Sequence, residues 1–131
     1  LTFHLKPANW PFNARLADGV VIAAVEAGLD PDPFLHRAFA AVWEDQFDLA
    51  DPATVTRLAD QSGLPGQQLV ERSASDAIAA AYERNRRDAL AADVFGSPAY
   101  VLNGEVFWGR DRIELLGDAL KSGRGAYSSV I

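Results

Sequence analysis

The sequence predicts a mixed α/β protein with about six helices and a single β-hairpin. Two observations predict this class. Asn103-Gly104 lies between two short apolar runs, residues 99–102 and 105–108, and a type I′ turn needs a positive φ at both of its central residues. Apolar side chains recur at helical spacing through most of the remaining chain, in stretches that prolines and glycines separate.

Several helix boundaries carry their own signals. Asn13 is a candidate cap for the first helix, and Gly28 is a candidate end. Asp51-Pro52 combines an N-cap acid with a proline at the first helical position, which is a common start signal. The expected helices span about residues 12–27, 31–47, 52–61, 65–72, 75–92 and 110–121.

The amino-acid composition excludes several classes of protein. The chain has 131 residues, of which 49% are apolar, with a net charge of −6 and a pI near 4.7. The length suggests one domain, and the acidic balance argues against a nucleic-acid partner. No apolar run has the length of a membrane span, and no signal-peptide pattern is present. The absence of cysteine excludes a disulfide, a cysteine nucleophile and a thiolate metal site within this chain.

The stretch around the hairpin is the best candidate for a site. Ser97-Pro98 precedes the first strand, and a helix is expected to begin near Arg110, just after the second. Such a helix would direct free backbone N–H groups and its positive dipole end toward the Ser97-Pro98 loop. The sequence therefore predicts an anion-receptive arrangement there.

Two confident strands are too few for a stable sheet, because an isolated hairpin is marginal in water. Either residues 1–5, which alternate apolar and polar, add a strand, or further strands come from outside this chain. The chain begins with Leu and contains no Met. We therefore expect it to be processed or to be part of something longer.

Three segments carry a resemblance to a known family. They are KPANWPFNARLADGVVIAA, AFAAVWEDQFDLADPATVTRLADQSGL and FGSPAYVLNGEVFWGRDRIELLGDAL. Together they resemble the 2-hydroxychromene-2-carboxylate isomerases, which are relatives of kappa-class glutathione transferases and DsbA-like proteins. The resemblance covers nearly all of residues 1–122, and the Trp-Gly-x-Asp-Arg form favours the isomerases over the other branches.

The resemblance implies a thioredoxin-like α/β fold with an all-helical insertion. We expect an extended leading segment at residues 1–11, the helical insertion domain at 12–92, the C-terminal ββα part at 93–122 and a loose tail at 123–131. The family's first βαβ part would precede Leu1 and is expected to be missing from this chain. The catalytic serine of the isomerases would lie in that part, so no catalytic residue is assigned here.

Site residues follow from the resemblance, position by position. Pro98 matches the family's cis-proline, and Ser97 would offer its backbone N–H and C=O to the cysteinyl part of glutathione. Asp111 would bind the γ-glutamyl ammonium, while free helix N–H groups and Arg110 would bind the carboxylate. Trp108 could form a wall of the pocket. No metal ligand is expected; His4 and His36 are isolated in the sequence.

The implied activity is that of an isomerase of aromatic, naphthalene-type degradation in bacteria. With glutathione as cofactor it interconverts 2-hydroxychromene-2-carboxylate and trans-o-hydroxybenzylidenepyruvate. The implied partners are glutathione, a small aromatic carboxylate and a second copy of the chain, with no nucleic acid and no membrane, in the cytoplasm. The alternatives are a kappa-like glutathione transferase, a DsbA-like thiol-disulfide oxidoreductase, or a non-catalytic module if the protein truly starts at Leu1.

Simpler interpretations remain open for several of these residues. Ser97-Pro98 could be an ordinary trans turn, and Asp111 could simply complement the helix dipole. Arg112 is interpreted as structural, pairing near the hairpin. Trp10, Trp43 and the phenylalanines are expected in the core.

Overall fold

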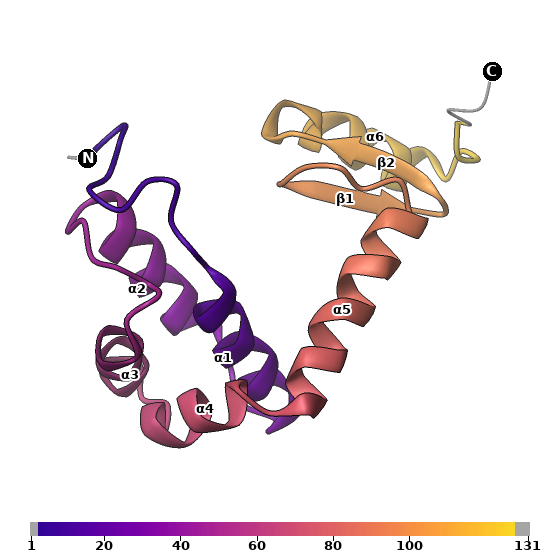
Figure 1. The fold of residues 1–131 in the computed structure, drawn as a ribbon. Helices are drawn as coiled ribbons and strands as arrows, with labels where there is room; N and C mark the ends of the chain where they lie inside the picture. The colour runs from indigo at the N-terminus through magenta and orange to yellow at the C-terminus, as the bar shows by residue number, and fades with distance from the viewer. Residues whose placement is uncertain (1–2, 128–131) are drawn as a thin grey trace. The chain divides into compact units, whose positions relative to one another are not determined.

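The computed structural model describes residues 3–127, which form two compact units that divide between residues 83 and 84. The boundary falls inside a helix, α5 (Asp76–Ala91). The end of α5 lies close to residue 92, where the helical part was predicted to end. The mixed α/β class predicted from the sequence is confirmed (Figure 1).

The first unit is helical, and its first two helices, Arg15–Glu26 and Asp32–Trp43, are shorter than the predicted ranges of 12–27 and 31–47. The Asn13 carboxamide oxygen accepts a hydrogen bond from the Arg15 amide at 3.0 Å. The Asp51 carboxylate accepts from the amides of Ala53 and Thr54, which caps the third helix as predicted. The helices of this unit are α1 (Arg15–Glu26), α2 (Asp32–Trp43), α3 (Pro52–Gln61), α4 (Gly66–Ser73) and the first part of α5.

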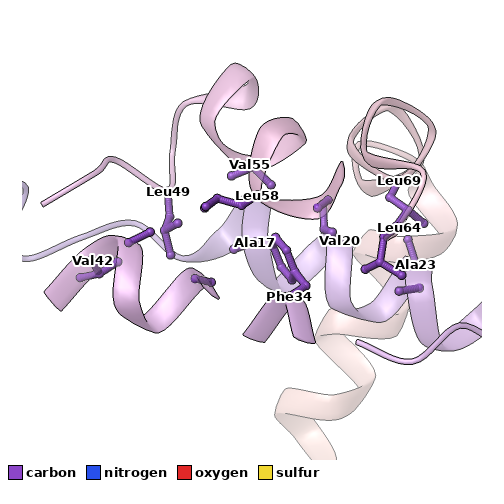
Figure 2. Close-up of a cluster of buried hydrophobic side chains, with 14 of the residues drawn as sticks. Ala17, Val20, Ala23, Phe34, Val42, Leu49, Val55, Leu58, Leu64 and Leu69 are labelled. Atoms are coloured by element: carbon purple, nitrogen blue, oxygen red, sulfur yellow. The ribbon is translucent and has the colours of Figure 1, made fainter. Parts of the chain in front are cut away.

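The core of the first unit is apolar throughout, and Figure 2 shows the side chains that build it. Phe34 on α2, Val20 on α1 and Val55 on α3 are fully buried, and so is Ile78 on α5. No buried polar or charged residue occurs among the residues that the structure describes. The unit is therefore held together mainly by burial of apolar area and close packing.

Several aromatic residues expected in the core are exposed instead. Phe34 and Phe107 are buried, and Trp43 is partly buried. Trp10, Phe39 and Phe95 are 52%, 62% and 75% exposed. Trp10 and Phe95 lie in irregular segments. For Phe39, helical spacing places a residue on a face of its helix without showing what covers that face.

The leading segment contributes no strand in the part that the structure describes. Leu1 and Thr2 lie outside the described residues, and residues 3–5 are irregular. The His4 amide donates a hydrogen bond to the carbonyl of Trp43 at 2.7 Å. The segment is thus attached to the end of α2.

The second unit contains the predicted hairpin. Strands β1 (Ala99–Leu102) and β2 (Glu105–Trp108) are antiparallel, and Asn103 and Gly104 have φ values of 52° and 87°, as a type I′ turn requires. Among the described residues these strands form a sheet of two. A short 3-10 turn, η1 (Arg110–Arg112), leads into α6 (Ile113–Ser122). Phe107 on β2 and Ala119 on α6 are the buried residues of these elements.

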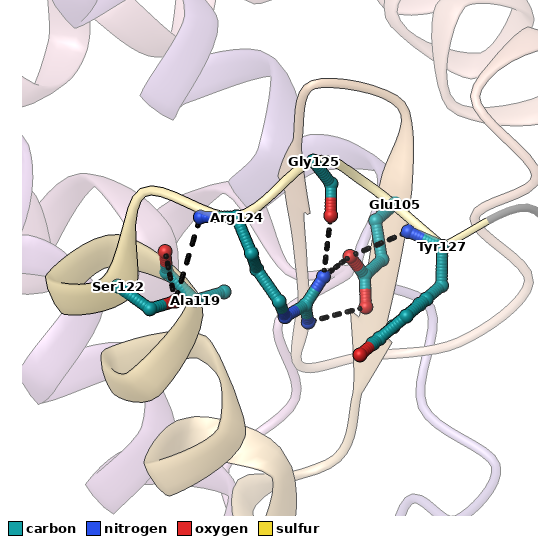
Figure 3. Close-up of polar contacts among 6 residues, drawn as sticks. All are labelled: Glu105, Ala119, Ser122, Arg124, Gly125 and Tyr127. Atoms are coloured by element: carbon teal, nitrogen blue, oxygen red, sulfur yellow. Dashed lines mark hydrogen bonds and ion pairs between the residues drawn. The ribbon is translucent and has the colours of Figure 1, made fainter.

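The segment after α6 is attached to β2, although it was expected to be loose. The guanidinium of Arg124 donates to both carboxylate oxygens of Glu105, at 2.7 and 2.9 Å (Figure 3). The Tyr127 amide donates to the same carboxylate at 3.1 Å. The hydrogen bonds from Arg124 hold the pKa of Glu105 below its ordinary value. Residues 124–127 therefore have defined positions, and residues 128–131 lie outside the described part.

Candidate functional site

The register of the hairpin aligns the two halves of the predicted site. Ala99 pairs with Trp108, and the alignment continues outward, because the Gly109 amide donates to the Pro98 carbonyl at 2.9 Å. Beyond this hydrogen bond the strand geometry ends, because Gly109 has φ 103° and ψ 153° and the chain enters the turn at Arg110–Arg112. The Ser97-Pro98 loop therefore lies next to Gly109, the residue that precedes the turn at Arg110–Arg112.

The loop presents exposed backbone at this point. Ser97 and Pro98 are both exposed, and the peptide bond between them is cis, as the resemblance implied. Within residues 3–127, neither the N–H nor the C=O of Ser97 has a hydrogen-bond partner. An exposed, unpaired donor and acceptor on one residue can pair with an extended peptide in the manner of one more strand.

The helix after β2 begins with a 3-10 turn, and the α-helix starts only at Ile113, later than expected. Gly109, with φ 103° and ψ 153°, redirects the chain between β2 and η1. The Arg112 amide donates to the Gly109 carbonyl at 3.1 Å. In the described part of the chain the amides of Arg110 and Asp111 have no partner. These amides are available to an anion.

The charged side chains at this helix start point into solvent. Arg110 and Asp111 are exposed. The Asp111 carboxylate lies 3.6 Å from the Arg112 guanidinium, and these side chains are 77% and 55% exposed. Arg112 thus pairs with its neighbour in the chain, shortly after the hairpin ends at Trp108. An exposed pair of this kind contributes little to stability, so Asp111 can exchange it for a ligand at small cost.

Aromatic side chains lie beside the loop. Trp108 is half-exposed, and the ring of Phe95 contacts its indole with centroids 5.0 Å apart. Sequence reasoning named Trp108 but gave Phe95 no role. The sequence contains one signal for a role of Phe95. Phe95 lies two residues before Ser97, in the same FGSP segment as the predicted site residues Ser97 and Pro98.

Two shallow hollows in the second unit share Trp108. One, of about 370 Å³, also contacts Arg112, Leu115 and Tyr127. The other, of about 300 Å³, is bounded by Phe95, Val106 and Tyr127, among others. Neither is lined by the other four predicted site residues, Ser97, Pro98, Arg110 and Asp111. The structure thus links Pro98 through the backbone to Gly109, the residue before Arg110, and Trp108 borders both hollows.

Within residues 3–127, no group of three or more His, Asp or Glu side chains is arranged to hold a metal ion. None of the helices in that part has the length and apolar character needed to cross a membrane.

Comparison with known proteins agrees with this arrangement of elements. A family model described as a DSBA-like thioredoxin domain matches residues 1–121. A protein named 2-hydroxychromene-2-carboxylate isomerase from Sphingobium xenophagum is 28% identical over 111 residues, covering 84% of this chain and 57% of that protein. A protein of the same name from Pseudomonas sp. (strain C18) is 25% identical over 114 residues, covering 87% of this chain and 52% of that protein.

These matches establish the family and the fold class predicted from the sequence. The chain spans little more than half the length of the two isomerases that it resembles. The family model covers nearly the whole chain. The chain belongs to the DSBA-like thioredoxin-domain family.

Proposed function

We propose that this chain carries the glutathione-binding part of a glutathione-dependent isomerase, which interconverts 2-hydroxychromene-2-carboxylate and trans-o-hydroxybenzylidenepyruvate. The observation that carries the proposal is the alignment of the Ser97-Pro98 loop with the start of the helix that bears Asp111. The names of the two relatives, together with the FGSP and WGRDR segments, support the choice of reaction.

The residues present fit a zwitterionic peptide. Ser97 offers one unpaired donor and one unpaired acceptor to the cysteinyl part of glutathione. Asp111 would bind the γ-glutamyl ammonium through a charge-assisted hydrogen bond, and Arg110 with the unpaired amides of η1 would bind the adjacent carboxylate. Trp108 and Phe95 would shield one side of the bound peptide from water.

Bound glutathione would supply a thiol that adds reversibly to the substrate and so permits ring opening and rotation about a bond. The residues of this chain would orient the tripeptide through its γ-glutamyl and cysteinyl parts. Orientation of one reactant is itself a large part of catalysis, because it removes translational and rotational freedom before the chemical step. No residue of this chain is assigned to hold the thiolate.

Glutathione binding by the 131-residue chain tests the proposal. Asp111→Ala should weaken binding, measured by titration calorimetry, by about 1–3 kcal/mol, the range for loss of a hydrogen bond to a charged group. Asp118→Ala is the matched control, because it removes an exposed acid from α6, outside the site, and should leave the affinity unchanged.

Two results would count against the proposal. Equal affinities for Asp111→Ala and the native chain would show that Asp111 does not belong to the site. Absence of binding at millimolar glutathione would show that the chain has no glutathione site. Conversion of 2-hydroxychromene-2-carboxylate is then measured by absorbance with and without glutathione. Conversion that does not depend on glutathione would overturn the assigned reaction.

A further inference from the structure

A second candidate site lies in the first unit, where α1 and α2 enclose an apolar pocket of about 80 Å³. Its walls include Phe12, Val21, Phe34 and Trp43. A water needs only about 10–15 Å³ by this kind of measure, so the pocket has room for a group about the size of a ring. It lies entirely within one compact unit and shares no residue with the proposed glutathione site.

Aromatic rings form one side of this pocket. Phe12 and Trp43 meet edge to face, with centroids 6.2 Å apart. Trp10, which is half-exposed, packs against both, at 5.6 and 5.5 Å. Rings at these distances touch one another and leave no gap for a cation between them. The pocket beside them, in contrast, can receive the flat face or the edge of an aromatic ligand.

Asp18 is the charged residue of the pocket lining. It lies in the first turn of α1, where the helix dipole favours an acid. Within residues 3–127 its carboxyl group accepts no side-chain or backbone hydrogen bond, and Arg15 supplies the nearby positive charge. The guanidinium of Arg15 lies 3.9 Å over the ring of Tyr82. Burial of Asp18 leaves its carboxylate poorly solvated, and this raises its pKa.

The net negative charge of the first unit favours a cationic ligand over an anionic one. Residues 1–83 contain twelve Asp and Glu against five Lys and Arg, a formal charge of −7. An ionised carboxyl group can only accept hydrogen bonds, so it needs a donor. A cationic donor would be attracted both by Asp18 and by the unit as a whole, whereas an anion would be repelled by both.

We propose that the pocket between α1 and α2 binds a small aromatic amine, with the ring among Phe12, Val21 and Trp43 and the ammonium group on Asp18. This site is separate from the proposed isomerase activity. The substrate of that reaction is a carboxylate, which Asp18 would repel.

A matched series of probes tests the pocket on the native chain. Benzylamine, benzyl alcohol and benzoate share a ring and differ in charge, and binding is followed by NMR shifts of the Val21 and Leu35 methyl groups, both from the pocket lining. Benzylamine should bind at least about tenfold more tightly than benzyl alcohol, as expected for a charge-assisted hydrogen bond. Benzoate should produce no shift. Absence of a benzylamine shift, or equal binding of benzoate, would overturn the proposal.

Asp18→Asn then separates the role of the charge from that of the pocket. This variant should lose about tenfold or more in benzylamine affinity and keep its benzyl alcohol affinity. Asp32→Asn is the matched control, because it removes an exposed acid from the first turn of α2 in the same unit and should keep the benzylamine affinity. Equal benzylamine affinity in the native chain and Asp18→Asn would show that Asp18 does not bind the amine.

Discussion

At the scale of single residues, Gly109 joins β2 to the helix that bears Asp111. Its backbone, at φ 103° and ψ 153°, lies in a region that essentially only glycine adopts. A Cβ at this position would also lie 2.5 Å from a carboxylate oxygen of Asp111. Gly109 therefore both turns the chain and leaves room for the Asp111 side chain.

Gly109→Ala should destabilise the protein by about 1–3 kcal/mol, the cost of a residue held in a sparsely populated backbone region. It should also weaken glutathione binding, because Asp111 must move. Urea unfolding and calorimetry give the two quantities. Gly117→Ala is the control: Gly117 lies inside α6 with open space around it, so alanine there should be neutral or stabilising. Equal stability of Gly109→Ala and the native chain would contradict this account.

Asp18 makes a pH-dependent contribution to stability. Burial raises its pKa above the ordinary value of 3.8, so the protonated form is favoured in the fold. Asp18 therefore does not lower the free energy of unfolding below about pH 3.8. It lowers this free energy as the pH rises from there through the raised pKa. Asp18→Asn should be more stable than the native chain at pH 7 and equally stable at pH 3, by urea unfolding at the two pH values. A native chain more stable than Asp18→Asn at pH 7 would reverse the sign and contradict the prediction.

At the scale of elements, the Glu105 carboxylate connects β2 to the segment after α6. Because the pKa of Glu105 is lowered in the fold, this connection is present above its ordinary value of 4.5 and is lost as pH falls through the lower value. Glu105→Gln removes the charge that Arg124 and Tyr127 share.

The Tyr127 amide reports on this connection. Its protection from hydrogen exchange should be clear at pH 7, should be lost as the pH falls through the lowered pKa of Glu105, and should be absent at every pH in Glu105→Gln. Glu114→Gln changes an exposed acid in the first turn of α6 and should leave the protection intact. Protection that persists in Glu105→Gln would mean that other contacts hold the segment.

At the scale of the whole molecule, the core of the first unit rests on a few large buried side chains. Phe34→Ala should lower the free energy of unfolding of α1–α4 by about 3–5 kcal/mol, the range for truncating a buried phenylalanine. Hydrogen exchange of amides in those helices measures it. Phe39→Ala, on the same helix but 62% exposed, should stay within about 0.5 kcal/mol. Equal losses in the two variants would contradict the assigned core.

Helices, turns and family could be predicted because their signals are local. Asp51-Pro52 specifies its own cap, and Asn103-Gly104 specifies its own turn, since each acts over fewer than about five residues. The FGSP and WGRDR segments, compared with known proteins, indicate the family in the same direct way. The position of Pro98 beside Gly109 also follows from the sequence, once the turn sets the register.

Other features required the tertiary structure. Phe34 and Phe39 both carry a benzyl group on α2, yet one is fully buried and the other largely exposed. Which face of a helix is covered depends on segments far away in the chain, and helical spacing carries no information about them. The hydrogen bond from Arg124 to Glu105 and the position of Asp18 in the lining of its pocket also depend on segments that are distant in the chain. The sequence by itself determined the elements and the family of this protein, whereas packing between distant elements decided its buried residues, its pKa shifts and its pockets.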